Sequence, residues 1–162
     1  MSCHERDPAA RYVTLGINMA GLRCLVVGGG SVGTRKAQTL VAGGAGVTVL
    51  APRISQDLQQ AADAGRLQWL KSEYTAGGLE GFLLVVAATD DPALNLRIAA
   101  DAEQRGILSC NVSAADRSRV IFPALLSDGE ITVAVHSHGR SCRSSKDVRD
   151  AIAAWLSEHH GK

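Results

Sequence analysis

Apolar runs and segments with apolar residues at helical spacing alternate through the first 110 residues of the chain. We expect strands at residues 22–27, 47–51, 67–70, 82–88 and 107–110. Helices are expected at 32–42, from a cap at Ser55 to Ala64, and from Asp90 or Asp91 with Pro92 to about Arg105. The run Phe82–Ala88 has seven consecutive apolar residues, which is typical of a parallel strand covered on both faces. This order predicts an α/β fold with a doubly wound parallel sheet.

The pattern changes after Asn111. Two strands are expected at residues 120–126 and 130–136, joined by a hairpin turn at Ser127–Gly129. A last helix is expected to start at Ser144 or Ser145, and its apolar positions are Val148, Ile152, Trp155 and Leu156. We therefore divide the chain into residues 1–121 and a small hairpin-plus-helix region, residues 122–162. Because the sheet is already covered, we expect a second copy of the chain to cover this region in a homodimer.

A glycine motif joins the first strand to the first helix. The segment Gly28-Gly29-Gly30-Ser31-Val32-Gly33 fits G-x-G-x-x-G in a strand-to-helix context. Gly28 allows the tight turn, Gly30 lets a pyrophosphate approach the backbone, and Gly33 lets helix and strand pack closely. The helix start at Ser31 and Val32 offers free N–H groups to an anion. The motif predicts a Rossmann-like dinucleotide-binding domain; the alternative is a glycine-rich turn without a ligand.

Two further strand ends are expected beside the dinucleotide. The acidic residue that usually follows the second strand is missing, and Pro52 and Arg53 stand there instead. Arg53 can attract a 2′-phosphate, so by chemistry alone NADP fits as well as NAD; otherwise Arg53 is a solvated surface cation. The fourth strand ends at Ala88-Thr89-Asp90, which we expect on the nicotinamide-ribose side. The same residues also suit a helix cap, and both interpretations can hold together.

Several segments together resemble the precorrin-2 dehydrogenases, which occur alone or as the N-terminal module of siroheme synthases. The resemblance covers about residues 10–158. The matching pieces are residues 21–37, 49–52, 86–91, Asn95, 110–112, 121–124 and 133–137. The pair Arg35-Lys36 and the strand end Ala88-Thr89-Asp90-Asp91 separate this family from other domains with the glycine motif.

The resemblance implies a specific activity and partners. Such proteins oxidise precorrin-2 to sirohydrochlorin with NAD as hydride acceptor, and some also insert ferrous iron. They are usually homodimers in which the tetrapyrrole lies between the nucleotide cleft and the region that follows. Substrate-binding residues are then expected after the fifth strand, at Asn111 and Ser113, and after the seventh, at His136, Ser137 and Arg140.

The chain departs from the family at three places. Ala114 stands where many members have the Asp proposed as general base and metal-insertion residue, so we expect a dehydrogenase with little or no ferrochelatase activity. Asp116 and His138 are the substitute candidates for the base, and Asp116 is otherwise a solvated turn residue beside Arg117. The second departure follows the seventh strand, where His136, His138 and Arg140 are additional to the family's pattern. His136 and His138 are otherwise a solvent-facing pair on one side of a strand. The helical segment that usually follows is absent, which fits a short natural version or a truncated chain.

Composition narrows the function classes. Hydrophobic residues are 46% and charged residues 20%, the net charge is +1, and aromatic residues are only 4%. We therefore expect a globular cytoplasmic protein with an aliphatic core and no nucleic-acid or membrane partner. The four cysteines form no C-x-x-C pair, so we expect no metal site and buried thiols at Cys24 and Cys110. The rival functions are a nucleotide-sensing module and a tetrapyrrole carrier or regulator without turnover.

Overall fold

The computed structural model describes residues 12–128 and 130–159 of the 162-residue chain. These residues form two compact units, one of residues 16–120 and one of residues 12–15 with 121–159. We describe each unit by itself. The elements of the larger unit are β1 (Arg23–Val27), α1 (Ser31–Ala42), β2 (Gly46–Leu50), α2 (Gln56–Asp63), β3 (Gln68–Leu70), β4 (Leu84–Ala87), α3 (Pro92–Gln104), β5 (Leu108–Asn111) and the 3₁₀ turn η1 (Ala115–Arg117).

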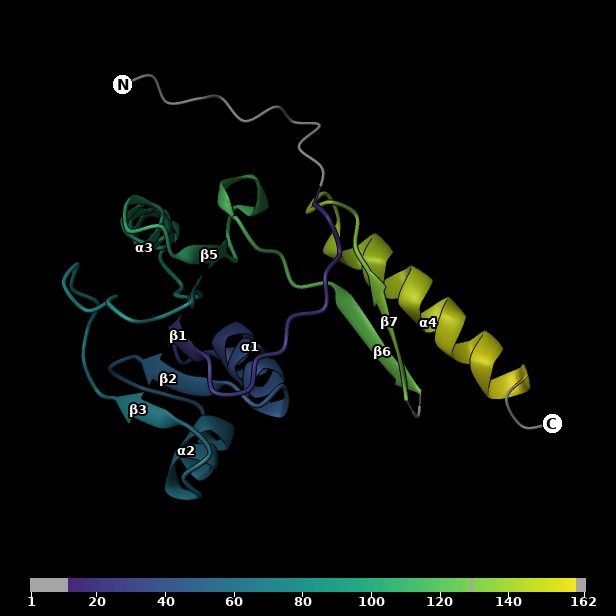
Figure 1. Ribbon diagram of the computed structural model, residues 1–162, viewed down its shortest axis with the longest axis horizontal. Helices are drawn as coiled ribbons and strands as arrows, with labels where there is room; N and C mark the ends of the chain where they lie inside the picture. The colour runs from purple at the N-terminus through teal and green to yellow at the C-terminus, as the bar shows by residue number, and fades with distance from the viewer. Residues whose placement is uncertain (1–11, 129, 160–162) are drawn as a thin grey trace. The chain divides into compact units, whose positions relative to one another are not determined.

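The larger unit is built on one parallel sheet with the strand order β3-β2-β1-β4-β5. Val26 at the centre pairs with Val49 of β2 on one side and with Val86 of β4 on the other. The chain leaves β1 in one direction through β2 and β3, and then returns to extend the sheet in the other direction. Right-handed crossovers therefore put α1 and α2 on one face and α3 on the opposite face (Figure 1). The predicted doubly wound α/β sheet is confirmed.

The core of this unit is aliphatic, as the low aromatic content predicts. Leu25, Val27 and Val85 point from the sheet toward Ile98 and Ala102 of α3, and all five are buried. Cys24 and Cys110 are buried free thiols in the strands, as expected. Burial raises the pKa of Cys24, so this thiol stays protonated and serves as a small apolar side chain.

Helix caps agree closely with the sequence signals. Ser55 caps α2 by accepting the Leu58 N–H at 3.3 Å. Asp91 caps α3 in the same way, because its carboxylate accepts the N–H groups of Ala93 and Leu94. The caps fix where each helix begins, which in turn fixes the direction of the loops that precede them.

The smaller unit is an antiparallel hairpin, β6 (Ala124–Asp128) and β7 (Ile131–Val135), packed against α4 (Cys142–His159) (Figure 1). The prediction that the first hairpin strand begins at residue 120 is wrong. The N–H groups of Arg119 and Val120 instead bond to the Ser109 carbonyl, and Pro123 has no N–H to give to a ladder. The expected turn shortens accordingly because Ser127 and Asp128 belong to β6, while Gly129 lies outside the described residues.

The last helix begins at Cys142 and not at Ser144 or Ser145, so that prediction is also wrong. Ser141 caps α4: its hydroxyl accepts the Ser144 N–H at 3.1 Å and the Ser144 hydroxyl at 2.9 Å. Ser145, expected at the helix start, is buried within the first turns and bonds back to the Ser141 carbonyl. Several serines in succession all suit a cap, and only the fold selects one of them. Within the described residues, no helix has the length and apolar character needed to cross a membrane.

Candidate functional site

Three glycines at the junction of β1 and α1 leave no room for a side chain, namely Gly28, Gly29 and Gly33, and two of them lie where α1 meets the strands. Gly28 has φ +118°, and a Cβ there would lie 2.2 Å from the Ala88 carbonyl oxygen. A Cβ on Gly33 would lie 2.2 Å from the Gly28 carbonyl oxygen. Glycine at both places therefore lets the first turn of α1 pack directly against the ends of β1 and β4.

Gly30 has a different role in the same loop. It is the N-cap of α1 with φ −78°, and a Cβ there would meet no atom within 4 Å. The space above it is open, and the first N–H groups of α1 have no partner within the helix. The positive end of the helix dipole lies at the same place. These features together make a site that suits a phosphate or pyrophosphate group.

A cavity of about 670 Å³ opens over this loop. Its volume lies in the range of small-molecule sites. The cavity is bounded by the glycine loop, the ends of β2 and β4, the segment after β3 and two apolar residues; the lining residues are Val27, Gly28, Gly29, Gly30, Ser31, Val32, Leu50, Ala51, Pro52, Arg53, Ser72, Glu73, Tyr74, Ala88, Thr89, Asp90, Leu94 and Val112. All residues predicted for the cofactor line it except Gly33, which lies beneath the loop as a packing residue.

The glycine loop is fastened to the start of α2. The N–H of Ser55 donates to the Gly29 carbonyl at 3.0 Å, and the hydroxyls of Ser55 and Thr34 lie 2.8 Å apart. Thr34 also donates its hydroxyl proton to the Gly30 carbonyl at 2.9 Å. Because these bonds hold the loop in place, its open N–H groups are preorganised. Ligand binding then avoids the entropic cost of ordering the loop.

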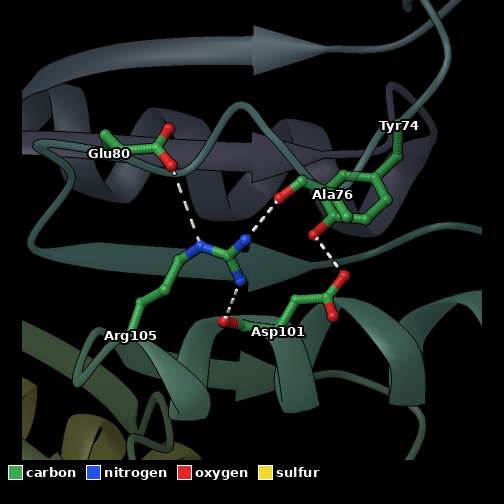
Figure 2. Close-up of polar contacts among 5 residues, drawn as sticks. All are labelled: Tyr74, Ala76, Glu80, Asp101 and Arg105. Carbon is green, nitrogen blue, oxygen red and sulfur yellow. Dashed lines mark hydrogen bonds and ion pairs between the residues drawn. The ribbon is translucent and has the colours of Figure 1, made fainter.

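One wall of the cavity comes from the irregular segment of residues 71–83, which sequence reasoning missed. Tyr74 of this segment lines the cavity, and its hydroxyl donates to the Asp101 carboxylate at 2.9 Å (Figure 2). Arg105 donates to the carbonyl oxygens of Ala76 and Asp101, both at 2.8 Å. The available signal was topological, because the segment follows the carboxyl end of a parallel strand, where ligands bind.

Burial raises the pKa of Tyr74, and the hydrogen bond to the Asp101 carboxylate raises it further. The phenol therefore stays protonated at every physiological pH and remains a hydrogen-bond donor. Figure 2 shows Glu80 on the other side of Arg105, with the carboxylate 3.9 Å from the guanidinium Nε. Together these contacts hold the segment of residues 71–83 against α3.

The residues after β5 have distinct surroundings. The Asn111 side-chain oxygen accepts the N–H groups of Ser113 and Ala114 at 2.9 and 3.2 Å. Among the residues that the structure describes, the Asn111 side-chain nitrogen is the one buried side-chain nitrogen or oxygen without a hydrogen-bond partner. Asp116 is 78% exposed, lies 3.6 Å from the Arg117 guanidinium and does not line the cavity.

The predicted residues of the smaller unit gather in the loop between β7 and α4. His136 Nε2 lies 2.8 Å from the Thr14 hydroxyl, and the rings of His136 and His138 are 4.7 Å apart. The two histidines were expected on a strand, but β7 ends at Val135, so both belong to the loop. His138 has φ +52°, a left-handed conformation that turns the chain toward α4. Within the described part of the chain, no three His, Cys, Asp or Glu side chains gather as metal ligands would.

The Ser137 hydroxyl closes this loop. It accepts the Ser141 N–H and donates to the Ser141 carbonyl, both at 2.8 Å. Ser137 is therefore occupied in shaping the turn, while the N–H of Arg140 bonds to the Ser137 carbonyl at 3.0 Å.

Residues 15–124 match a family profile described as "Putative NAD(P)-binding". The chain belongs to this NAD(P)-binding family. Among curated proteins, the siroheme synthase of Chromobacterium violaceum is 41% identical over 86% of this chain and 30% of its own length. That of Azotobacter vinelandii is 36% identical over 93% of this chain and 32% of its own length. The chain thus spans about a third of the length of these relatives.

A solved structure resembles this chain beyond the residues that match the family profile. The precorrin-2 dehydrogenase SirC superposes with a TM-score of 0.78 at 25% identity. The match covers 88% of this chain and 70% of that one. The matched share of this chain is larger than the share that forms the unit with the glycine motif. This NAD(P)-binding protein therefore resembles SirC in part of the hairpin-and-helix unit as well.

Proposed function

We propose that this protein is a precorrin-2 dehydrogenase that oxidises precorrin-2 to sirohydrochlorin with NAD as hydride acceptor. The observation that carries the proposal is the cavity over Gly30 at the start of α1, in a chain whose relatives are siroheme synthases and a precorrin-2 dehydrogenase. The geometry fits a dinucleotide, because Gly30 is the glycine of the loop whose Cβ position is open, and it lies where a pyrophosphate needs room.

The residues that line the cavity divide into binding roles. When bound, the nicotinamide supplies a two-electron acceptor for a hydride. The N–H groups of Gly30, Ser31 and Val32 bind the pyrophosphate at the helix start. Pro52 and Arg53 border the adenosine half, and Thr89 with Asp90 orients the nicotinamide ribose. The chain contributes mainly alignment of two flat ligands and exclusion of water from the reacting faces.

The substrate side is proposed at polar and cationic residues that follow β5 and β7. Precorrin-2 carries many carboxylates, for which hydroxyls and the Arg140 guanidinium are suitable partners. The buried unpaired donor on Asn111 supports a ligand acceptor at that position, since such a group is costly to leave unsatisfied. Ser113, His136 and Ser137 complete the proposed set.

The proton that leaves the substrate goes to a base or to water. Asp116 and His138 stay the predicted candidates for that base. Ala114 has no group that can take up a proton or guide a metal ion, which supports little or no insertion of ferrous iron as a second substrate. The homodimer and the cytoplasmic location also stay predictions; the exposed apolar side chains of Val148 and Trp155 support the former.

The test is an absorbance assay on the purified protein. Precorrin-2 is mixed with NAD or with NADP, and sirohydrochlorin formation is followed. We expect turnover with NAD, and the comparison with NADP tests whether Arg53 also accepts a 2′-phosphate. Asp116→Ala should be about 10²-fold slower when this carboxylate is the base. Ferrous iron is then added, and iron insertion is expected at no more than the uncatalysed rate.

The outcomes separate the alternatives. Tight tetrapyrrole binding without oxidation would favour a carrier or regulator. Nucleotide binding without tetrapyrrole binding would favour a sensing module. Rapid siroheme formation would contradict the assignment of Ala114 as the residue that removes ferrochelatase activity.

A further inference from the structure

Asn95 is a polar side chain that is completely buried in the first turn of α3. Its side-chain oxygen accepts the Thr89 N–H at 3.0 Å and the Thr89 hydroxyl at 2.8 Å. Its side-chain nitrogen donates to the Thr89 carbonyl at 3.0 Å and to the Ser113 hydroxyl at 2.8 Å. Both N–H groups and both lone pairs of the amide are thus used.

These four bonds join two loops that are distant in the sequence. Thr89 follows β4 and lines the cavity, whereas Ser113 follows β5 and lies next to Val112, which also lines the cavity. β4 and β5 are neighbours in the sheet, so both loops leave from the same edge. The Asn95 amide bonds to both the N–H and the carbonyl oxygen of Thr89, and these two bonds fix the orientation of Thr89 in the cavity.

A buried amide is costly unless all its bonds are made, and an apolar residue would fill the same space without that cost. The network is therefore not explained by packing alone. Its geometry is directed at the backbone of one cavity residue and at one hydroxyl of the next loop. Thr89 follows β4, on the side of the sheet where the nicotinamide half of a dinucleotide lies.

We propose that Asn95 is a positioning residue that sets Thr89 against the nicotinamide half of the cofactor and couples it to the substrate-side loop through Ser113. The inference rests on the proposed function. Asn95 touches neither ligand, and it acts through Thr89 and Ser113. The coupling makes the placement of the nicotinamide dependent on the loop that follows β5.

The first test is the isosteric variant Asn95→Asp. The carboxylate keeps the acceptor for the Thr89 N–H and hydroxyl, and the Ser113 hydroxyl can turn to donate to it. The bond to the Thr89 carbonyl cannot be remade, because two acceptors then face each other. Binding of AMP, ADP and NAD is measured by calorimetry, because AMP and ADP lack the nicotinamide ribose. We expect AMP and ADP to bind as in the wild type and NAD to bind about tenfold more weakly, as for one lost buried hydrogen bond.

The second test is Ser113→Ala, which addresses the coupling and leaves every Asn95–Thr89 bond in place. We expect the NAD dissociation constant to rise about threefold and that of ADP to stay unchanged. In the double variant the losses should not multiply, because both changes act on one network. This variant also keeps the proposal testable when Asn95→Asp does not fold, since the Ser113 side chain is exposed.

Ile98→Val is the matched control, because Ile98 is a fully buried residue one turn further along α3. It should lower the melting temperature without changing the ratio of NAD to ADP affinity. Equal weakening of all three ligands by Asn95→Asp would overturn the proposal and leave a structural role only. Unchanged NAD affinity in Ser113→Ala would overturn the coupling. Failure of the wild type to bind either ADP or NAD would instead refute the dinucleotide site itself.

Discussion

At the scale of single residues, the glycines of the loop have two different roles. Some are needed for backbone packing, and one leaves open space for a ligand. Gly28 and Gly33 are required because neighbouring carbonyl oxygens fill the position of a Cβ. Gly30 is free of both constraints, since its φ is ordinary and its Cβ position is open. A substitution at Gly30 therefore tests binding, and a substitution at Gly33 tests folding.

Gly30→Asp is expected to abolish dinucleotide binding while the fold is kept. The new carboxylate would occupy the open space and repel the pyrophosphate, whereas aspartate is itself a favourable N-cap for α1. Calorimetry should show at least about a hundredfold loss of NAD affinity, which corresponds to about 2.7 kcal/mol. Thermal unfolding should stay within a few degrees of the wild type.

Two further variants serve as controls. Gly30→Ala places a small uncharged group in the same space and should weaken NAD binding less than the aspartate does. Gly33→Ala should destabilise the protein by about 1–3 kcal/mol, because α1 must move away from the Gly28 carbonyl. Unchanged NAD affinity in a folded Gly30→Asp variant would show that the pyrophosphate binds elsewhere.

At the scale of elements, the irregular segment between β3 and β4 covers part of the core, although it is not a helix. Leu79 of this segment is fully buried in the core beside α3. The polar contacts of Tyr74 and Arg105 hold the segment from its outer side (Figure 2). An irregular wall of the cavity is thereby given a defined position.

The hydrogen bond between Tyr74 and Asp101 predicts a pH dependence of stability. The pKa of Tyr74 is higher in the folded protein than in the unfolded chain, where it is about 10. Above that pH the unfolded chain releases a proton that the folded protein retains, so the free energy of unfolding falls as the pH rises. Urea titrations between pH 9 and 11 should show a steeper fall for the wild type than for Tyr74→Phe.

The variant Asp101→Asn is the matched control for the Tyr74–Asp101 hydrogen bond. It keeps an acceptor for the Tyr74 hydroxyl and removes the negative charge that opposes ionisation, while the effect of burial remains. Its stability should fall with pH at a slope between those of the wild type and Tyr74→Phe. Parallel curves for all three proteins would show that Tyr74 does not contribute to the alkaline loss of stability.

At the scale of the whole molecule, the hairpin-and-helix unit leaves large apolar side chains uncovered. Trp155 is 56% and Val148 50% exposed on α4, and Leu125 and Ile131 are exposed on the hairpin. Large exposed apolar side chains that gather on one small unit indicate a protein interface. A two-fold dimer is the commonest way to cover them.

We therefore expect a dimer at micromolar concentration and a monomer for Trp155→Asp, as measured by light scattering. The control is Lys146→Glu, because Lys146 lies two and a half turns before Trp155, on the opposite side of α4. This control should remain dimeric. A monomeric wild type at the same concentration would refute the homodimer.

Much of the architecture was predictable from the sequence because it depends on local periodicity. Each apolar run of the sheet, the caps at Ser55 and Asp91, and the glycine turn are encoded within a few consecutive residues. The rule that ligands bind at the carboxyl ends of parallel strands then identified Arg53 and Thr89 as lining residues before any contact was known. The start of α4 was missed because Ser141, Ser144 and Ser145 are equivalent as local cap signals.

Only the tertiary structure decided the polar contacts that support the site. Arg105 bonds to Ala76, 29 residues away, and Asn95 bonds to Ser113, 18 residues away. No hydrophobic period encodes such a pair, since each partner is an ordinary polar residue in its own segment. The pairing exists because the strand order brings β4, β5 and the segment after β3 to one edge of the sheet. Polar groups that are buried there need hydrogen-bond partners, and neighbouring loops supply them. The sequence by itself thus determined the elements and the glycine cradle, and the packing of the sheet decided which side chains hold them in place.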